Sequence, residues 1–142
     1  MKCWKGLLFF LILAICTGVL GRSADSDDLV IICKLKRITR NVPDCGIIHF
    51  GSLAEYRDLR ILRGRYSESR IYVVHDCIEL PRESYTEKGI YFKKFTEGDY
   101  HKMLLSKKNT IRVESVENGE IVPNLPLYYC RRVGVVSSTS IK

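Results

Sequence analysis

The chain has 142 residues, with 23 Lys and Arg against 16 Asp and Glu, so its formal charge is +7. That length accommodates one ordinary domain and excludes most large enzyme architectures. A composition of 46% hydrophobic and 27% charged residues is typical of a globular protein and excludes a disordered tail. The sequence contains no glycine-rich nucleotide motif, no phosphate-binding loop and no Gly-x-Ser-x-Gly motif.

The N-terminus has the pattern of a signal peptide. Two lysines precede an apolar run from Leu7 to Leu20, which is shorter than the roughly 20 apolar residues of a membrane-spanning helix. Small residues suited to a cleavage site precede Arg22, so we expect removal of residues 1–21. The sequence therefore predicts a secreted or periplasmic protein with no stable membrane span after cleavage. The alternatives are an uncleaved anchor and a lipoprotein modified at Cys16.

The remaining chain begins with a polar, acidic lead-in over 22–28, which we expect to be flexible. The chain has the pattern of a strand from Leu29 onward: Ile31, Cys33 and Leu35 fall on one face, and Lys34 and Lys36 fall on the other. Asn41 to Gly46 has the composition of a turn.

The clearest strand runs from Arg70 to Leu80 and is ended by Pro81. Further strands are predicted over 90–95, 100–105, 110–116 and 127–133. Asn118-Gly119 predicts a hairpin turn between the apolar residues on either side of it. We expect the tail, 137–142, to be frayed.

One segment fits two structures. Ser52-Leu-Ala-Glu55 is a capping box, and Gly64 stands where a helix would end. Leu53, Tyr56, Leu59 and Leu62 recur every three residues. Local rules therefore favour a helix over 52–63, although the segment lies between predicted strands and also fits a strand that leads into a turn.

Short strands about ten to twelve residues apart predict a small β-barrel or sandwich. Tyr56-Arg-Asp-Leu-Arg-Ile-Leu-Arg-Gly64, followed by Arg70-Ile-Tyr-Val-Val-His75, resembles the paired strands of netrin-like domains, and Gly89-Ile-Tyr-Phe-Lys93 is similar to the strand that follows them. These domains share an OB-type barrel with the tissue inhibitors of metalloproteinases and have exported bacterial relatives. The resemblance spans about 29–105 and favours strand over helix for 55–63.

The resemblance implies a mainly-β, five- to six-stranded OB-like barrel, stapled by disulfides, as a single domain over 29–136. In the metalloproteinase inhibitors the first mature residue is a cysteine whose amine and carbonyl chelate the zinc of the target. Here the mature chain is expected to begin near Arg22, and its first cysteine is Cys33. The inhibitory mechanism is therefore not expected, and only the fold carries over.

Four cysteines remain after cleavage: Cys33, Cys45, Cys77 and Cys130. An even number in an exported chain predicts two disulfides, for which three pairings exist. The interpretation that we prefer joins Cys33 to Cys45 and Cys77 to Cys130.

Several groups of residues have side chains of the types found in catalytic or metal-binding sites. Zinc needs four donors, and the nearest set is His49, His75, Cys45 and Cys77. A cysteine nucleophile would use His75 or His101 as its base. Carboxylate pairs for glycoside chemistry are Asp76 with Glu79 and Glu97 with Asp99. None has a diagnostic spacing, and we predict no metal, no cofactor and no catalytic residue.

The clearest interaction candidate is an arginine-rich hairpin composed of Arg57, Arg60, Arg63, Arg65, Tyr66 and Arg70. In a regular strand Arg57 and Arg63 share one face and Arg60 lies on the other. The mature chain keeps 21 basic and 16 acidic residues, a charge of +5. We expect a monomeric exported interaction module that contacts a protein or an anionic surface, and no nucleic acid. The alternative is a small secreted hydrolase or metal-dependent enzyme that uses His75 with the neighbouring Asp76 and Cys77.

Overall fold

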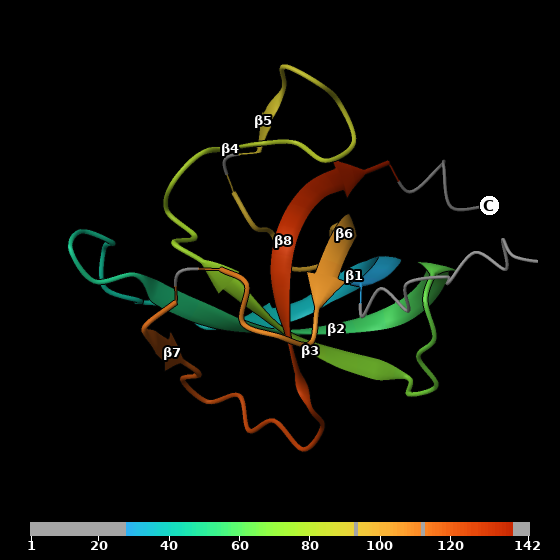
Figure 1. The fold of residues 1–142 in the computed structure, drawn as a ribbon, viewed down its shortest axis with the longest axis horizontal. Coiled ribbons are helices and arrows are strands. Elements are labelled where there is room, and N and C mark those ends of the chain that lie inside the picture. The colour runs from blue at the N-terminus through green and yellow to red at the C-terminus, as the bar shows by residue number, and fades with distance from the viewer. Residues whose placement is uncertain (1–27, 93, 112, 138–142) are drawn as a thin grey trace, which may run out of the picture.

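The computed structural model describes residues 28–92, 94–111 and 113–137 (Figure 1). The predicted signal peptide, the lead-in before Asp28 and the tail after Ser137 lie outside the described residues. No helix in the described part of the chain is long and apolar enough to cross a membrane. The strands are β1 (Asp28–Ile38), β2 (Phe50–Arg63), β3 (Arg70–Asp76), β4 (Arg82–Glu83), β5 (Tyr91–Phe92), β6 (Tyr100–Ser106), β7 (Ser115–Glu117) and β8 (Leu127–Val136).

Five strands close into a barrel. Their order is β1-β6-β8-β3-β2, and pairing of β1 with β2 completes the ring. Neighbouring strands of the ring are antiparallel except β3 and β8, which are parallel. A sixth strand, β7, pairs with β2 from outside, and β4 and β5 form a separate hairpin (Figure 1). The prediction of a mainly-β, OB-like barrel with a disulfide is confirmed.

Alternation along the strands fills the barrel interior with large side chains. At most 1% of the surface is exposed for Ile31, Leu35, Tyr56, Ile71, Val73, Met103, Leu105 and Val133. Burial of such side chains stabilises the fold by about 1.5–3 kcal/mol each. The alternation predicted for β1 and β3 places these side chains as expected.

Part of the outer face of β2 and β3 is also covered. Leu53, Tyr72 and Val74 point away from the interior and pack with Ile121 in a second apolar cluster. The rest of this cluster comes from the segment between β6 and β8 and from the start of β8: Ile111, Val113, Val116, Leu125, Leu127 and Tyr129. In OB-folds the face of these two strands is the usual site for oligonucleotides and oligosaccharides. Here the chain itself occupies the part of this face around Leu53, Tyr72 and Val74.

Three expectations from local sequence are wrong. The segment 52–63 belongs to β2, as the resemblance indicated, and is not the helix that local rules favour. The third strand ends at Asp76 rather than at Leu80, because Cys77 has a positive φ of 39°. Asn118-Gly119 does not join a hairpin, because β7 pairs in parallel with β2 instead.

Candidate functional site

Two bulges place three of the predicted arginines on one side of β2. Between Arg57 and Arg60, two residues of β2 lie opposite one residue of β1. Between Ile61 and Arg63, β2 has one extra residue, because their partners Ile31 and Val30 are adjacent on β1. Asp58, in the first bulge, has a φ of 54°. Each bulge reverses the alternation, so Arg57, Arg60 and Arg63 all point outward. The prediction that Arg60 faces the opposite side is therefore wrong.

Neighbouring strands add basic residues to this line. Arg57 lies directly opposite Lys34 of β1 and Arg70 of β3, and Ile32 of β1 lies opposite both Arg60 and Lys102 of β6. Residues directly opposite one another in a sheet share a face. We call this surface the basic face: Lys34, Arg57, Arg60, Arg63, Arg70 and Lys102. It spans β3, β2, β1 and β6.

A buried carboxylate anchors one edge of the basic face. Glu55 accepts hydrogen bonds from Arg37 at 2.8 Å and from Arg57 at 2.9 Å, while only 1% of its own side chain is exposed. Burial alone raises the pKa of Glu55, but the hydrogen bonds and charges of the two arginines hold it below its ordinary value. The charge of Glu55 therefore offsets that of Arg57 in part and fixes the position of its guanidinium.

The basic face borders a hollow of about 450 Å³ beside β1 and β2. Lys34, Lys36 and Arg57 line it together with Asp58 and Glu97. The carboxylate of Glu97 also pairs with Arg40 at 2.9 Å, which offsets its charge. The hollow can therefore receive an anionic group beside the cations.

The turn between β2 and β3 contributes less than the sequence suggested. Arg65 is exposed, but Tyr66 packs edge-on against Tyr128 and donates a hydrogen bond to the carbonyl of Arg70 at 2.6 Å. Burial, followed by the charges of neighbouring groups, raises the pKa of Tyr66 to about 12. The ring of Tyr66 therefore supports the hairpin, and its contact with a partner stays a prediction.

The disulfide pairing differs from the prediction. Cys45 bonds to Cys77, whereas Cys33 and Cys130 are free and buried in the barrel interior. Burial raises the pKa of Cys33 well above its ordinary value and that of Cys130 to about 12. Both thiols stay protonated at neutral pH and are poor nucleophiles. The preferred pairing of Cys33 with Cys45 and of Cys77 with Cys130 is thus wrong.

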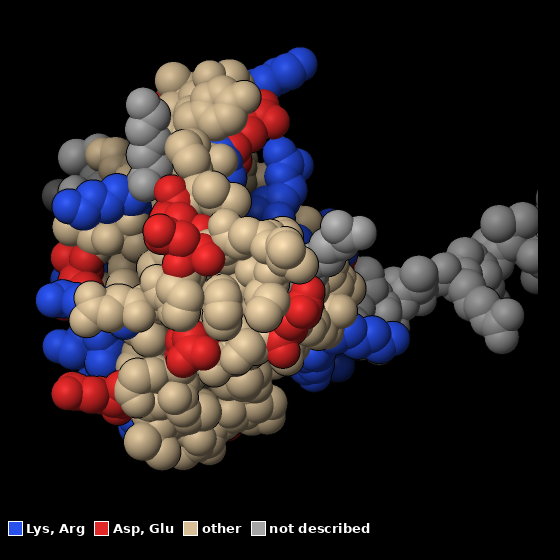
Figure 2. Space-filling view, turned by 90° about the vertical axis from the view of Figure 1, so that its left-hand side faces the viewer, with Lys and Arg blue, Asp and Glu red and all other residues tan. Residues whose placement is uncertain are grey.

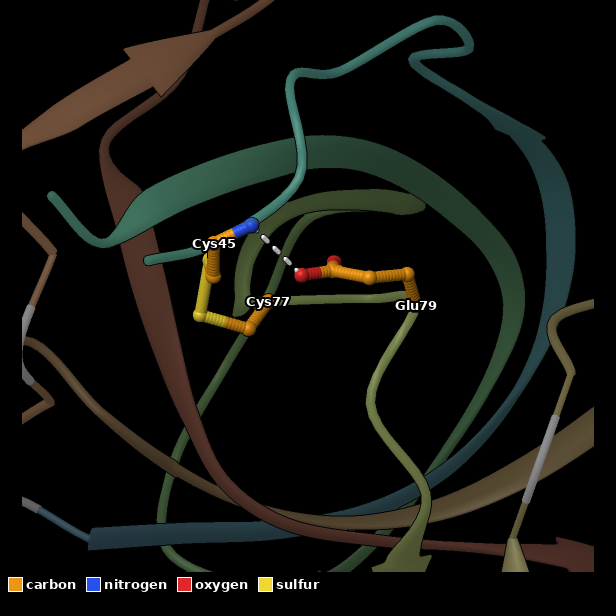
Figure 3. A group of neighbouring side chains, drawn as sticks. All are labelled: Cys45, Cys77 and Glu79. Atoms are coloured by element: carbon orange, nitrogen blue, oxygen red, sulfur yellow. Dashed lines mark hydrogen bonds between the residues drawn. A yellow bond between two sulfur atoms is a disulfide. The ribbon is translucent and has the colours of Figure 1, made fainter. Parts of the chain in front are cut away.

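Polar groups surround the disulfide at the end of the barrel beside the 39–49 loop. The main-chain nitrogen of Cys45 donates to Glu79 Oε1 at 2.7 Å (Figure 3). His49 Nδ1 lies 3.3 Å from Asp76 Oδ1 and 3.5 Å from Cys77 Sγ. Figure 2 shows the molecule from this side: most of the surface is uncharged, acidic groups are scattered over it, and Lys and Arg lie toward its margins. This end thus differs from the basic face.

The other predicted histidines lie inside the barrel. His75 Nε2 and His101 Nδ1 are 2.9 and 3.2 Å from the Tyr56 hydroxyl, and all three residues are fully buried. Burial lowers the pKa of His101 to about 4 and also lowers that of His75 well below its ordinary value. Of the four zinc donors that the sequence offers, Cys45 is bonded to Cys77 and His49 lies beside Cys77, whereas His75 lies inside the barrel. The side chain of His75 has no access to a substrate in solvent.

Sequence reasoning missed part of the basic face and the acid that anchors it. Lys34 and Lys102 lie on strands far from the hairpin in sequence, so only the closed ring places them beside Arg57 and Arg60. Glu55 was considered only as part of a capping box. A signal for the basic face was available in the outward lysines of β1.

Comparison with known proteins identifies no relative. The chain matches no family model, and no curated protein or solved structure matches it with significance.

Proposed function

We propose that the protein is an exported interaction module, akin to netrin-like domains, and that its basic face binds an extended polyanion. The observation that carries this proposal is the row of Lys34, Arg57 and Arg70 directly opposite one another on three neighbouring strands. Like charges in such positions destabilise a sheet. A row of this kind is explained if an anion offsets the repulsion.

The shape of the basic face favours a chain-like ligand over a single ion. Arg57 and Arg63 are six residues apart on β2, which at about 3.3 Å per residue gives a spacing of up to about 20 Å. Lys34 and Lys102 widen the surface across the next two strands. A sulfated polysaccharide carries charges over such a length, and the part of the outer face of β2 and β3 around Leu53, Tyr72 and Val74 is covered by the chain itself.

The test measures binding of the mature protein to heparin as a function of salt. Arg60→Ser with Arg63→Ser should raise the Kd about two- to thirty-fold, since exposed ion pairs contribute about 0.2–1 kcal/mol each. The matched control is Lys88→Ser with Lys107→Ser, which removes the same charge from exposed residues outside the basic face. Binding should weaken as salt rises, because salt screens exposed charges. Equal losses in both double variants would contradict a localised site.

A further inference from the structure

The cluster beside the disulfide has the donor types and the spacing of a metal site. Three different donors converge there: an imidazole nitrogen of His49, a carboxylate oxygen of Asp76 and the sulfur of Cys77, all within 4.8 Å of one another. The sulfur of Cys45 is bonded to that of Cys77. Thiolate, imidazole and carboxylate together are the ligands that zinc takes in proteins.

The distances agree with the edges of a zinc tetrahedron. With zinc–ligand bonds of about 2.05 Å to nitrogen, 2.1 Å to oxygen and 2.3 Å to sulfur, nitrogen and oxygen lie about 3.4 Å apart, and nitrogen and sulfur about 3.6 Å apart. The observed separations are 3.3 Å from His49 Nδ1 to Asp76 Oδ1 and 3.5 Å from His49 Nδ1 to Cys77 Sγ. Two of the three edges among these donors thus match a zinc tetrahedron, and the third, from the Asp76 carboxylate to Cys77 Sγ, is within 4.8 Å.

The fourth ligand is held back by the disulfide itself. While the two sulfurs are bonded to each other, neither can act as a thiolate. Reduction by a dithiol breaks the sulfur–sulfur bond: the reductant supplies two electrons and two protons and becomes a disulfide. To bind zinc, the two sulfurs must separate to about 3.8 Å, the sulfur–sulfur edge of a zinc tetrahedron. Cys45 Sγ must also move towards His49 and Asp76, because it does not lie within 4.8 Å of both of them. Zinc displaces the two thiol protons as it binds.

We propose that reduction of the disulfide opens a zinc site with four ligands: Cys45, Cys77, His49 and Asp76. His49 and Asp76 are accessible to an entering ion, since 30% and 29% of their side chains are exposed. Glu79 lies close to both sulfurs, but its Oε1 accepts the main-chain N–H of Cys45. We assign Glu79 to positioning the loop rather than to binding the metal.

The experiment compares zinc binding by the oxidised and reduced mature protein. A phosphine reductant is suitable, because with water it reduces the disulfide, becomes a phosphine oxide and leaves no competing thiol. Native mass spectrometry should find one zinc per reduced chain and none on the oxidised chain. Cobalt in place of zinc should give the absorption of a thiolate-bound tetrahedral ion.

Variants separate the ligands from their neighbours. His49→Gln and Asp76→Asn should each weaken zinc binding at least ten-fold, because each removes one of four ligands. Glu79→Gln removes a nearby carboxylate and should change the affinity by less than three-fold. Cys33→Ala should retain the zinc, since that thiol is buried in the barrel interior.

Several results would overturn the assignment. These are equal zinc binding by the oxidised and reduced chains, zinc binding that survives His49→Gln, and a cobalt spectrum without thiolate bands. A larger loss in Glu79→Gln than in Asp76→Asn would refute the ligand set. If reduction unfolds the barrel, zinc should restore the circular dichroism of the folded chain, and failure to do so would also refute the site.

Discussion

Acid should destabilise the barrel well above the pH at which carboxylates titrate, because His101 and His75 are neutral in the interior. An unfolded chain binds a proton at each histidine with a pKa of about 6.5. In the folded chain burial lowers the pKa of His101 to about 4. Below pH 6.5 the unfolded chain therefore binds more protons than the folded chain. The contribution of the neutral imidazole to stability is complete above that pH and is lost as the pH falls. From His101 alone, the loss between pH 7 and pH 5 is about 2 kcal/mol.

The groups that face the two imidazoles explain why they stay neutral. The Tyr56 hydroxyl contacts both rings, and the second nitrogen of each ring has no partner among the described protein groups. For His75, burial is followed by the charge of Arg82 and then by His101 as causes of the lowered pKa. A proton on either ring would add a buried N–H and a charge without a counterion. His75 therefore adds to the loss with the same sign.

Urea unfolding at pH values from 7 to 5 measures this effect. His101→Gln should lose about 2 kcal/mol less than wild type over that range, when each protein is compared with its own stability at pH 7. Gly46→Ala, an exposed substitution that leaves the histidines in place, is the control and should lose as much as wild type. An unfolding free energy that stays constant from pH 7 to pH 5, or an unchanged slope in His101→Gln, would refute the buried neutral pair.

Two further predictions concern cross-linking and packing. Cys45→Ala should cost about 3–4 kcal/mol of unfolding free energy, because the disulfide closes a loop with a sequence separation of 32. The intact mass of the mature wild type should rise by two hydrogens on reduction. A rise of four hydrogens would mean that Cys33 and Cys130 are also bonded. Gly51→Ala should destabilise the folded chain by about 1–3 kcal/mol in thermal unfolding, because its added Cβ would lie 2.6 Å from a Val113 methyl. Gly46→Ala is the control, because an added Cβ there meets nothing within 4 Å. An equal loss of stability in both variants would contradict the packing around Gly51.

Alternation made most of the barrel predictable, and bulges account for what it missed. In β1 and β3 the apolar residues alternate without interruption on the side that faces the interior. In β2 the bulge at Asp58 puts Tyr56 and Leu59, three residues apart, on the same side. That spacing imitates a helix, so local rules favoured the wrong element. The resemblance to paired strands favoured the correct element, because that comparison rests on a longer stretch of chain.

The candidate sites were predictable only where the sequence itself groups the residues. The arginines of β2 are close in sequence and were found, whereas the direction of Arg60 depends on a bulge that no local pattern announces. The disulfide was missed because Cys45 and Cys77 meet through the pairing of Phe50 with the end of β3. The main-chain N–H of Cys77 donates to Phe50 O at 3.0 Å, and such a long-range contact leaves no local signal.

The place of β8 in the ring has a consequence for how the chain folds as it is made. This strand comes last in sequence, yet it lies between β6 and β3 in the ring. During synthesis or export from the N-terminus, β3 and β6 each expose an unpaired edge until residues 127–136 arrive. Such edges pair readily with other chains. Chaperones that delay collapse of the chain until the last strand emerges should therefore raise the yield of folded protein.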